Sequence, residues 1–452
     1  MGGFSSNNFT FLVLIATFVW FSSTTETCYA TRTNHWRHAR DAFEEPYADP
    51  PHQGSMFNVL DYGAKGDGTS DDTKAFEAAW EDTCKVEASM MIVPSGYKFL
   101  VGPTSFSGSH CRKNVHFLLD GTILAPTDSE SWGSGLDQWL EFTKLIGFTI
   151  KGKGTLDGRG SVWWTKSKLN EQSSGSVDAN MPSTRPMALR FVEGASVTVT
   201  GITIQNSPQF HLTFDNCDGV LVHSCNISSP SDSPNTDGIH LHNSKNVIIR
   251  DTDLACGDDC ISIQTGCTNV VVHNVNCGPG HGISIGSLGL DGTTSCVSNI
   301  TVRDINMHNT MTGVRVKTWQ GGAGLVKGVL FSNIRVSEVE TPIVIDQYYC
   351  DHGNCKNSIS AVGIMDIAYQ SIRGTYTVQP VHLACSDNKA CMDLVLSDIE
   401  LKPNPTDQQM YKPFCWQAFG KMNAPIMPEI DCLQEGQPSS SWDANDGTCA
   451  AA

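Results

Sequence analysis

The 452 residues carry a net charge of −17 at pH 7, from 30 Lys and Arg against 47 Asp and Glu. So acidic a chain is a poor match for nucleic acid or for an anionic membrane surface, and we expect neither as a partner. The 17 cysteines indicate disulfide bonds, which form in oxidising compartments and argue against a cytosolic protein.

The first 30 residues predict a secretory signal peptide. Residues 9–21 are mostly apolar, which suits the core of a signal and falls short of the ~20 residues that cross a bilayer. Met1-Gly2 followed by Ser6 also fits an N-myristoylation pattern, which is the alternative explanation of this segment.

A short helix is expected soon after this segment. Thr69-x-x-Asp72 has the pattern of a helix capping box. A helix over residues 73–84 would then carry four apolar side chains on its inner face, namely Ala75, Phe76, Ala79 and Trp80. We interpret the glycines of residues 63–68 and 152–158 as tight turns, because the lysine and the spacing of a phosphate-binding loop are missing.

Between residues 115 and 399 the sequence has almost no segments with helical periodicity. Short β-branched or apolar runs recur instead, most of them after an Asn or Gly, at residues 197–199, 220–222, 247–249, 270–272, 300–302 and 329–331. Short strands with one buried face, joined by polar turns, predict a right-handed parallel β-helix whose coils stack about 4.8 Å apart. A β-sandwich is the alternative, because short strands and turns also suit it.

Chemically active residues share this periodicity. Asp237, Asp259 and His281 recur every 22 residues (237, 259, 281). Equivalent residues on successive coils of a solenoid line up, so we expect these three in one row that Arg315 and Lys317 continue. The two cations stand two residues apart and therefore share one strand face. Each motif alone has an ordinary explanation as a turn or an exposed strand, whereas the whole set in register favours an active site.

The chain resembles the polygalacturonase family of glycoside hydrolases over residues 57–432. The resemblance rests on four motifs in the family's order, Asn235-Thr236-Asp237, Gly257-Asp258-Asp259, Gly280-His281-Gly282 and Arg315-Val316-Lys317. Val316 stands where the family has Ile. The resemblance implies an all-β, right-handed parallel β-helix that hydrolyses α-1,4-galacturonosidic bonds of polygalacturonan or pectin with inversion.

The expected domain organisation follows from these segments. A signal peptide at residues 1–30 and a flexible lead-in at 31–54 precede a catalytic β-helix at 55–434. The Ser- and Gly-rich residues 435–452 are expected to form a poorly ordered tail.

Cleavage of a glycosidic bond needs an acid at the leaving oxygen and a carboxylate that acts on water or on carbon. Three crowded Asp residues can supply both, because they cannot all ionise at their usual pKa. The resemblance implies that Asp258 is the general acid and that Asp237 and Asp259 hold and activate the water. It also implies that His281 hydrogen-bonds to this group.

The resemblance further implies four substrate-binding residues, namely Asn235, Arg315, Lys317 and Tyr349. Asn235 would orient the site, and the two cations would hold a galacturonate carboxylate. Tyr348 is a near competitor for the position of Tyr349 in the cleft. His211, about one coil upstream, would either contact sugar or lie in a turn.

Cysteine spacing and sequons predict covalent features. We expect three disulfides, namely Cys277–Cys296 across the insert after His281, Cys385–Cys391 and Cys415–Cys432. The exported context and the absence of paired Cys-x-x-Cys units favour such bridges over a zinc site. Sequons at Asn226 and Asn299 permit N-glycans.

Two other functions remain open. A pectate-lyase-like eliminase also fits a β-helix and an acidic sugar, but it needs calcium and a basic Arg or Lys, whereas this chain offers Asp258 and His281. A non-catalytic pectin-binding β-helix is the second alternative, and the complete set of carboxylates argues against it. We therefore expect a monomer that needs no metal or cofactor, is secreted to the plant cell wall, and acts on polygalacturonan or pectin.

Overall fold

The computed structural model describes residues 54–164, 183–351, 355, 357–404, 411–438, 442 and 449. The signal expected at residues 1–30, nearly all of the lead-in and most of the expected tail lie outside these ranges. In the part of the chain that the structure describes, no helix is long and apolar enough to cross a membrane.

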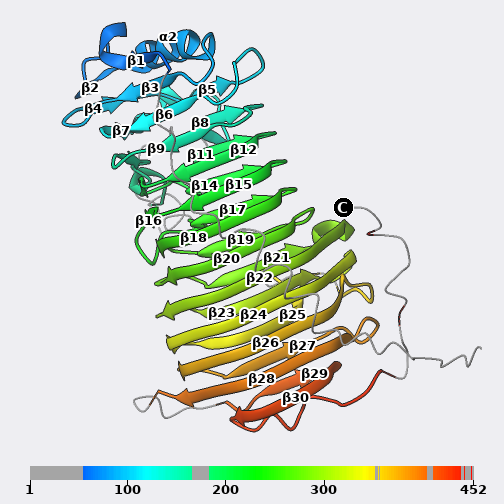
Figure 1. Ribbon diagram of the computed structural model, residues 1–452. Coiled ribbons are helices and arrows are strands. Elements are labelled where there is room, and N and C mark those ends of the chain that lie inside the picture. The colour runs from blue at the N-terminus through cyan, green and yellow to red at the C-terminus, as the bar shows by residue number, and fades with distance from the viewer. Residues whose placement is uncertain are drawn as a thin grey trace, which may run out of the picture. The chain divides into compact units, whose positions relative to one another are not determined.

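The described residues form a right-handed parallel β-helix, in which the strands of successive coils stack on one another (Figure 1). The 11-stranded sheet consists of β5 (Thr104–Ser107), β8 (Gln138–Thr143), β11 (Met187–Val192), β14 (Leu212–Asp215), β17 (Ile239–His242), β19 (Ile261–Ile263), β21 (Ile283–Leu288), β23 (Thr312–Trp319), β25 (Thr341–Tyr349), β27 (Val381–Ala384) and β29 (Phe414–Trp416). The predicted fold class is confirmed.

The 19-stranded sheet supplies the remaining walls of the coils. It consists of β1 (Met56–Asn58), β2 (Asp67–Asp71), β3 (Met90–Val93), β4 (Lys98–Leu100), β6 (His116–Leu119), β7 (Thr122–Leu124), β9 (Thr149–Lys151), β10 (Thr155–Asp157), β12 (Ala195–Thr200), β13 (Thr203–Gln205), β15 (Asp218–His223), β16 (Asn226–Ser228), β18 (Lys245–Ala255), β20 (Thr268–Cys277), β22 (Thr294–His308), β24 (Ala323–Val339), β26 (Gly363–Tyr376), β28 (Cys391–Pro403) and β30 (Ala418–Met427). The helical segments are α2 (Thr73–Cys84), η2 (Val59–Tyr62), η3 (Glu130–Trp132) and η4 (Leu290–Gly292).

Inward-facing residues of neighbouring coils pair in register. In the 11-stranded sheet one stack runs through Ile239, Ile261, Ile283, Val314 and Ile343, each with no exposed surface. Branched side chains repeated at strand spacing fill the interior between the walls without gaps. The apolar residues that recur in the sequence are therefore the ones that form this core.

Closer to the N-terminus, phenylalanines take the same inward position. Phe106, Phe142, Phe191 and Phe214 are register partners on β5, β8, β11 and β14. Their rings stack with centroids 4.8, 5.5 and 5.1 Å apart. This ladder of rings adds aromatic stacking to the burial of large apolar surfaces.

Helix α2 covers the first coils of the β-helix. Its bounds match the predicted helix, and its buried side chains include the four expected ones. Trp80 packs edge-on against Phe106 and Phe142 at 5.2 and 5.5 Å between ring centroids. The predicted capping box is wrong, because the Asp72 carboxylate accepts hydrogen bonds from the backbone N–H groups of Lys65 and Gly66 instead.

Asparagines form a ladder along the 19-stranded sheet. Asn246, Asn269 and Asn299 all have left-handed φ values near 55°, which Asn tolerates better than most residues. Asn269 Nδ2 donates to Asn246 Oδ1 at 2.9 Å, and Asn299 Nδ2 donates to Asn269 Oδ1 at 2.7 Å. At these three positions, the Asn that precedes a β-branched run therefore both turns the chain and joins successive coils.

The disulfides confirm two predicted pairs and correct one. Cys385–Cys391 and Cys415–Cys432 are present, but Cys277 bonds to Cys260, and Cys296 bonds to Cys449. In the pairing of β20 with β22, Cys277 at the end of β20 lies beside Met307, whereas Cys296 lies near the start of β22. The predicted Cys277–Cys296 bridge is wrong because its partners lie at opposite ends of parallel strands.

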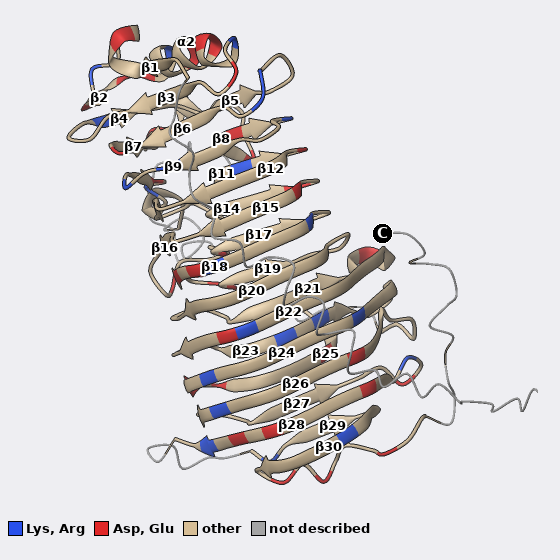
Figure 2. Cartoon of the chain, in the orientation of Figure 1, with Lys and Arg blue, Asp and Glu red and all other residues tan. Residues whose placement is uncertain are grey.

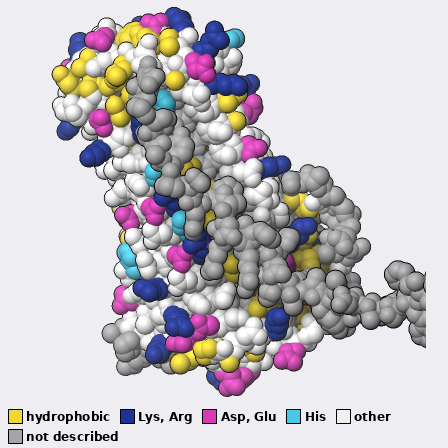
Figure 3. Space-filling model, in the orientation of Figure 1, with side chains coloured by type: hydrophobic (Ala, Val, Ile, Leu, Met, Phe, Trp, Pro, Cys, Tyr) yellow, Lys and Arg dark blue, Asp and Glu magenta, His cyan; other side chains and the backbone are white. Residues whose placement is uncertain are grey.

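Charged side chains are scattered along the coils (Figure 2). On the face shown in Figure 3, acidic and basic side chains are interspersed outside the grey atoms, and neither sign gathers into one patch.

We expect Phe142→Ala to lower the free energy of unfolding by about 3–5 kcal/mol, because it leaves a cavity in the middle of the aromatic ladder. The side chain is 2% exposed and stacks on rings from both neighbouring coils. Denaturant titration measures the loss. Phe414→Ala, at a residue that is 42% exposed, is the control and should stay within about 0.5 kcal/mol of the wild type. Equal losses in both variants would contradict this account of the core.

Candidate active site

The register of the 11-stranded sheet aligns three of the predicted residues. Asp237, Asp259 and His281 each stand two residues before a strand, namely β17, β19 and β21. These strands pair in register. The backbone N–H of Gly238 also donates to the carbonyl of Asp259 at 2.9 Å. The expected row of carboxylate, carboxylate and imidazole is present.

Arg315 and Lys317 are not in register with this row. Arg315 pairs in register with Ser284, which stands three residues after His281. The predicted continuation of the row by Arg315 is therefore wrong by three strand positions, because the insert after His281 changes the spacing. Val314 and Val316 face inward as expected, so Arg315 and Lys317 project together from the outer face of β23.

Arg315 and Lys317 both reach the carboxylate of Asp259. Arg315 Nη2 lies 2.7 Å from Asp259 Oδ1, and Lys317 Nζ lies 2.9 Å from Oδ2. Ser284 Oγ donates to Oδ1 at 2.8 Å, and Arg315 Nε donates in turn to Ser284 Oγ at 3.0 Å. All three charged side chains are at most 8% exposed, so these contacts are poorly screened by water.

The two cations set the protonation of Asp259. Burial opposes ionisation, but the charges of Lys317 and Arg315, together with the hydrogen bonds from Lys317 and Ser284, lower the pKa of Asp259 to about 2. Asp259 is therefore ionised throughout the physiological pH range.

Asp237 has the opposite surroundings. Its side chain is 7% exposed, and among the described residues its ion pair is with His240, whose Nδ1 lies 3.2 Å from Oδ2. Burial lowers the pKa of His240 to about 4, so this imidazole is neutral at pH 7. Burial and the negative charges of Asp258 and Asp259 raise the pKa of Asp237 well above its ordinary value. The proton that crowding was expected to keep on one carboxyl group is thus favoured at Asp237.

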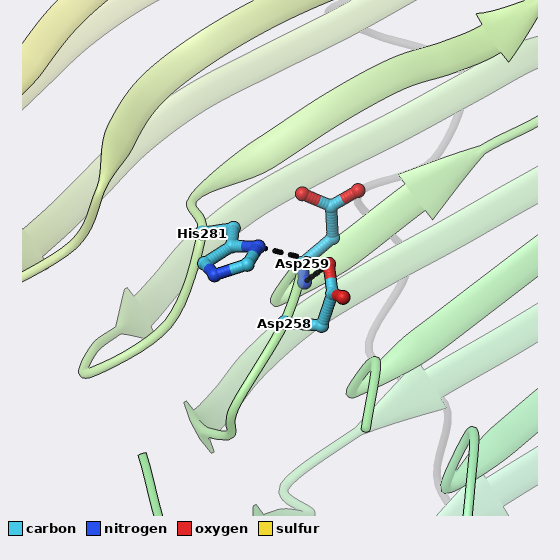
Figure 4. A group of neighbouring side chains, drawn as sticks. All are labelled: Asp258, Asp259 and His281. Carbon is cyan, nitrogen blue, oxygen red and sulfur yellow. Dashed lines mark hydrogen bonds and ion pairs between the residues drawn. The ribbon is translucent and has the colours of Figure 1, made fainter. Parts of the chain in front are cut away.

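Asp258 is the most exposed of the three carboxylates, at 19%. Its Oδ1 lies 3.0 Å from His281 Nδ1 and accepts the backbone N–H of Asp259 at 2.8 Å. Figure 4 shows the carboxylates of Asp258 and Asp259 pointing in different directions, with the imidazole beside Asp258. Burial opposes protonation of His281, but the hydrogen bond and the charges of Asp258 and Asp259 raise its pKa.

The cluster of Asp258, Asp259 and His281 also has the geometry to be considered as a metal site, since its ligand atoms lie within 4.8 Å of one another. Both oxygens of Asp259 already accept hydrogen bonds from cationic side chains. A divalent ion would have to displace these donors and would meet the charges of Arg315 and Lys317. The donor set therefore fits a metal poorly.

The remaining predicted residues divide between the site and the core. Asn235 Oδ1 accepts a hydrogen bond from Arg185 Nη2 at 2.7 Å. The ring of Tyr349 lies 5.3 Å from Lys317 Nζ, whereas the Tyr348 hydroxyl donates to an Asp387 oxygen at 3.3 Å. The structure therefore brings Tyr349, and not its competitor, to the two cations.

His211 has no exposed surface. Its Nδ1 lies 2.8 Å from the carbonyl of Asp237 and its Nε2 lies 2.7 Å from Ser229 Oγ, while burial lowers its pKa to about 4. Through its contact with the Asp237 carbonyl, His211 stabilises the turn that contains Asp237, so its role is structural.

The sequence motifs did not identify three residues that lie beside the cluster, namely Arg185, His240 and Ser284. His240 and Ser284 occupy the same outward register position as Arg315. Strand register could have found these two. Arg185 lies ahead of β11 and outside all four motifs, so no spacing pointed to it.

The model of Glycosyl hydrolases family 28 matches residues 84–413. The chain belongs to this family. A polygalacturonase from Cryptomeria japonica is 42% identical over 350 residues, which cover 77% of this chain and 67% of that protein. A probable polygalacturonase from Arabidopsis thaliana is 38% identical over 389 residues, covering 85% and 86%. The solved polygalacturonase of Erwinia carotovora superposes with a TM-score of 0.63 at 25% identity, over 81% of this chain and 97% of that one.

The family assignment confirms the resemblance found in the motifs and makes this chain a glycoside hydrolase. The match includes all four motifs, from Asn235 to Lys317. Within family 28, the geometry above shows how two aspartates in one small area, Asp237 and Asp259, come to differ in charge state.

Asp237→Asn should stabilise the protein at pH 7 while it removes a carboxyl group of the cluster. The folded-state pKa of Asp237 is above its ordinary value of 3.8, so the folded state favours the neutral form and wild-type stability falls as the pH rises above 3.8. Asparagine avoids this loss. We expect a higher melting temperature for the variant at pH 7 and no difference below about pH 3.5.

Asp259→Asn is the control of opposite sign. It leaves two buried cations without their partner, so we expect a loss of about 3–5 kcal/mol at pH 7. Because the folded-state pKa of Asp259 is about 2 and its ordinary value is 3.8, the wild-type advantage should disappear as the pH falls between these values. Melting curves from pH 2 to pH 8 measure both effects, and equal shifts in the two variants would contradict the assigned charge states.

Proposed function

We propose that this glycoside hydrolase cleaves α-1,4-galacturonosidic bonds in polygalacturonan or pectin with inversion. The observation that carries the proposal is the cluster itself, in which an ionised Asp259, a proton-retaining Asp237 and an accessible Asp258 lie beside cationic side chains. The named relatives are polygalacturonases, which supports the same substrate class. An acidic sugar polymer suits this site, because Arg315 and Lys317 project into it from the outer face of β23 and can attract sugar carboxylates.

Asp258 is the general acid in this mechanism. It is the carboxyl group with the most access to a bound glycosidic oxygen, and His281 and the backbone N–H of Asp259 orient it. Strongly coupled carboxyl groups share protons as one unit, so the proton favoured on Asp237 can reside on Asp258 when substrate is bound. Asp258 then gives this proton to the leaving oxygen.

Asp237 and Asp259 act on the water. Asp259 is held ionised by two cations and orients the water through a fixed negative charge. Asp237 has the raised pKa that makes a carboxylate a better proton acceptor, and it takes the proton as the oxygen attacks the anomeric carbon. One proton leaves the cluster and one enters it, so the total charge of the cluster is unchanged, and the passage of the proton from Asp237 to Asp258 prepares the acid for the next cycle.

Arg315, Lys317 and Tyr349 bind the sugar carboxylate in this proposal. Arg315 uses two of its five donors on Ser284 and Asp259, and Lys317 uses one of its three on Asp259. The remaining donors can serve a second carboxylate, and the Tyr349 ring covers the ammonium group at 5.3 Å.

An eliminase would abstract a proton from the sugar and would need a cation such as calcium to acidify it. The engagement of Asp259 by Arg315 and Lys317 disfavours this alternative, because it leaves no free basic side chain on β23 and few free ligands for calcium. Hydrolysis is therefore the reaction that this site supports best.

We further propose an extracellular monomer that acts in the plant cell wall. Six disulfides among the described residues support an oxidising location.

Both sequon asparagines are exposed, but Asn299 belongs to the asparagine ladder, where its Nδ2 is a donor. We expect an N-glycan at Asn226 in preference to Asn299. Glycopeptide mass spectrometry of protein from a plant host tests this, and occupancy at Asn299 alone would contradict it.

Asp258→Asn should lower kcat on polygalacturonate by about 10²–10⁴-fold, because it removes general acid catalysis and leaves the binding surface in place. Asp253→Asn, at an exposed position of β18, is the matched control and should leave kcat unchanged. Proton NMR of early products should show the inverted anomer. An unsaturated, ultraviolet-absorbing product, or loss of activity on chelation, would instead establish the eliminase.

A further inference from the structure

Arg185 is a cationic side chain beside the carboxylate cluster that has no ionic partner among the described residues. It is half-buried and lies two residues before β11. Its Nη1 donates to the carbonyl of Pro234 at 2.6 Å, and its Nη2 donates to Asn235 Oδ1 at 2.7 Å. Both acceptors are uncharged, so the guanidinium keeps its full positive charge where most arginines of a protein interior face a carboxylate.

The other cations of the site are already engaged. Arg315 and Lys317 share the carboxylate of Asp259, and Arg190, on the neighbouring β11, pairs with Glu141 and Asp215. Asp258 acts on Arg185 electrostatically from beyond ion-pair distance. A polyanionic substrate entering this site would therefore meet its least neutralised positive charge at Arg185.

The order of the coils places this charge on one side of the carboxylates. Strand β11 precedes β17 by two coils, and β23 follows β19 by two coils, as the pairings of the 11-stranded sheet show. Arg185 contacts the Asn235 turn from the N-terminal side, whereas Arg315 and Lys317 approach Asp259 from the C-terminal side. The three aspartates thus lie between two cationic positions along the axis of the β-helix.

We propose that Arg185 is a substrate-binding residue, which binds the carboxylate of the uronic acid unit on the N-terminal side of the scissile bond. The proposal rests on the proposed function. A guanidinium has five donors, and two of the five are used on Pro234 and Asn235, so a carboxylate can still receive a forked pair of hydrogen bonds. Because Arg185 occupies Asn235 Oδ1, it also leaves the Asn235 amide turned to offer its Nδ2 to a sugar hydroxyl.

This arrangement gives recognition on both sides of the bond that is cleaved. Arg185 holds one uronic acid unit, the β23 cations hold the next, and the glycosidic oxygen lies between them at Asp258. A substrate held at two carboxylates cannot slide along its own axis by a fraction of a sugar, so the arrangement fixes which oxygen meets the acid.

Arg185→Gln tests the proposal on de-esterified polygalacturonate, with Arg335→Gln as the matched control at an exposed arginine of the other sheet. We expect KM to rise about tenfold to hundredfold, as the loss of a charge-assisted contact predicts, while kcat stays within about threefold of the wild type. Arg185→Lys should restore part of the affinity, because it returns the charge without the fork.

A structural role alone predicts another result. If Arg185 only braces the Asn235 turn, Arg185→Gln should misplace the aspartates and lower kcat at least as much as it raises KM, and this outcome, or an unchanged KM, would overturn the proposal. If Arg185→Gln does not fold, the same KM and kcat comparison on Arg185→Lys decides it. A wild-type protein that shows no activity on polygalacturonate would instead reject the proposed function itself.

Discussion

The register between successive coils is the constraint on which both the core and the site depend. Ile239, Ile261 and Ile283 stack without exposed surface, and two residues before each of them stands Asp237, Asp259 or His281. A slip of one residue would turn the apolar stack outward. The packing that makes the slip costly therefore also keeps Asp237, Asp259 and His281 beside one another on adjacent coils.

The three aspartates differ in chemistry because their neighbours differ. Asp259 is surrounded by two cations and a hydroxyl group and is held ionised, whereas Asp237 has a neutral imidazole and two negative neighbours and resists ionisation. Asp258 is more exposed than the other two and lies beside His281. In the proposed mechanism one residue type thus provides a fixed charge, a proton acceptor and a proton donor, and the difference comes from burial and from the side chains of adjacent coils.

Much of this organisation could be predicted from the sequence, because it repeats. The period of the β-branched runs predicts the β-helix, the apolar spacing predicts α2, and the interval of 22 residues predicts the row from Asp237 to His281. Features that depend on unrepeated contacts could not be found in the same way. Cys296 bonds to Cys449, at a great distance along the chain, and the insert after His281 concealed that Ser284, and not His281, is level with Arg315. Arg185 lies outside every motif, so only the fold brings it to Asn235.

That insert has a consequence for how such a protein can change over evolutionary time. The extra residues between β21 and β23 are absorbed in a turn that begins at Gly289 and includes η4, and pairing resumes with Ile283 beside Val314. Length can therefore be added at this end of a coil while the apolar stack keeps its register, and the next coil has extra residues that pair with it, as Thr294 does with Ala323. Mutation can lengthen the turns near the proposed active site one at a time. A lineage of such enzymes can therefore acquire new preferences for polymer ends or decorated sugars while the proposed acid and base and the core stay the same.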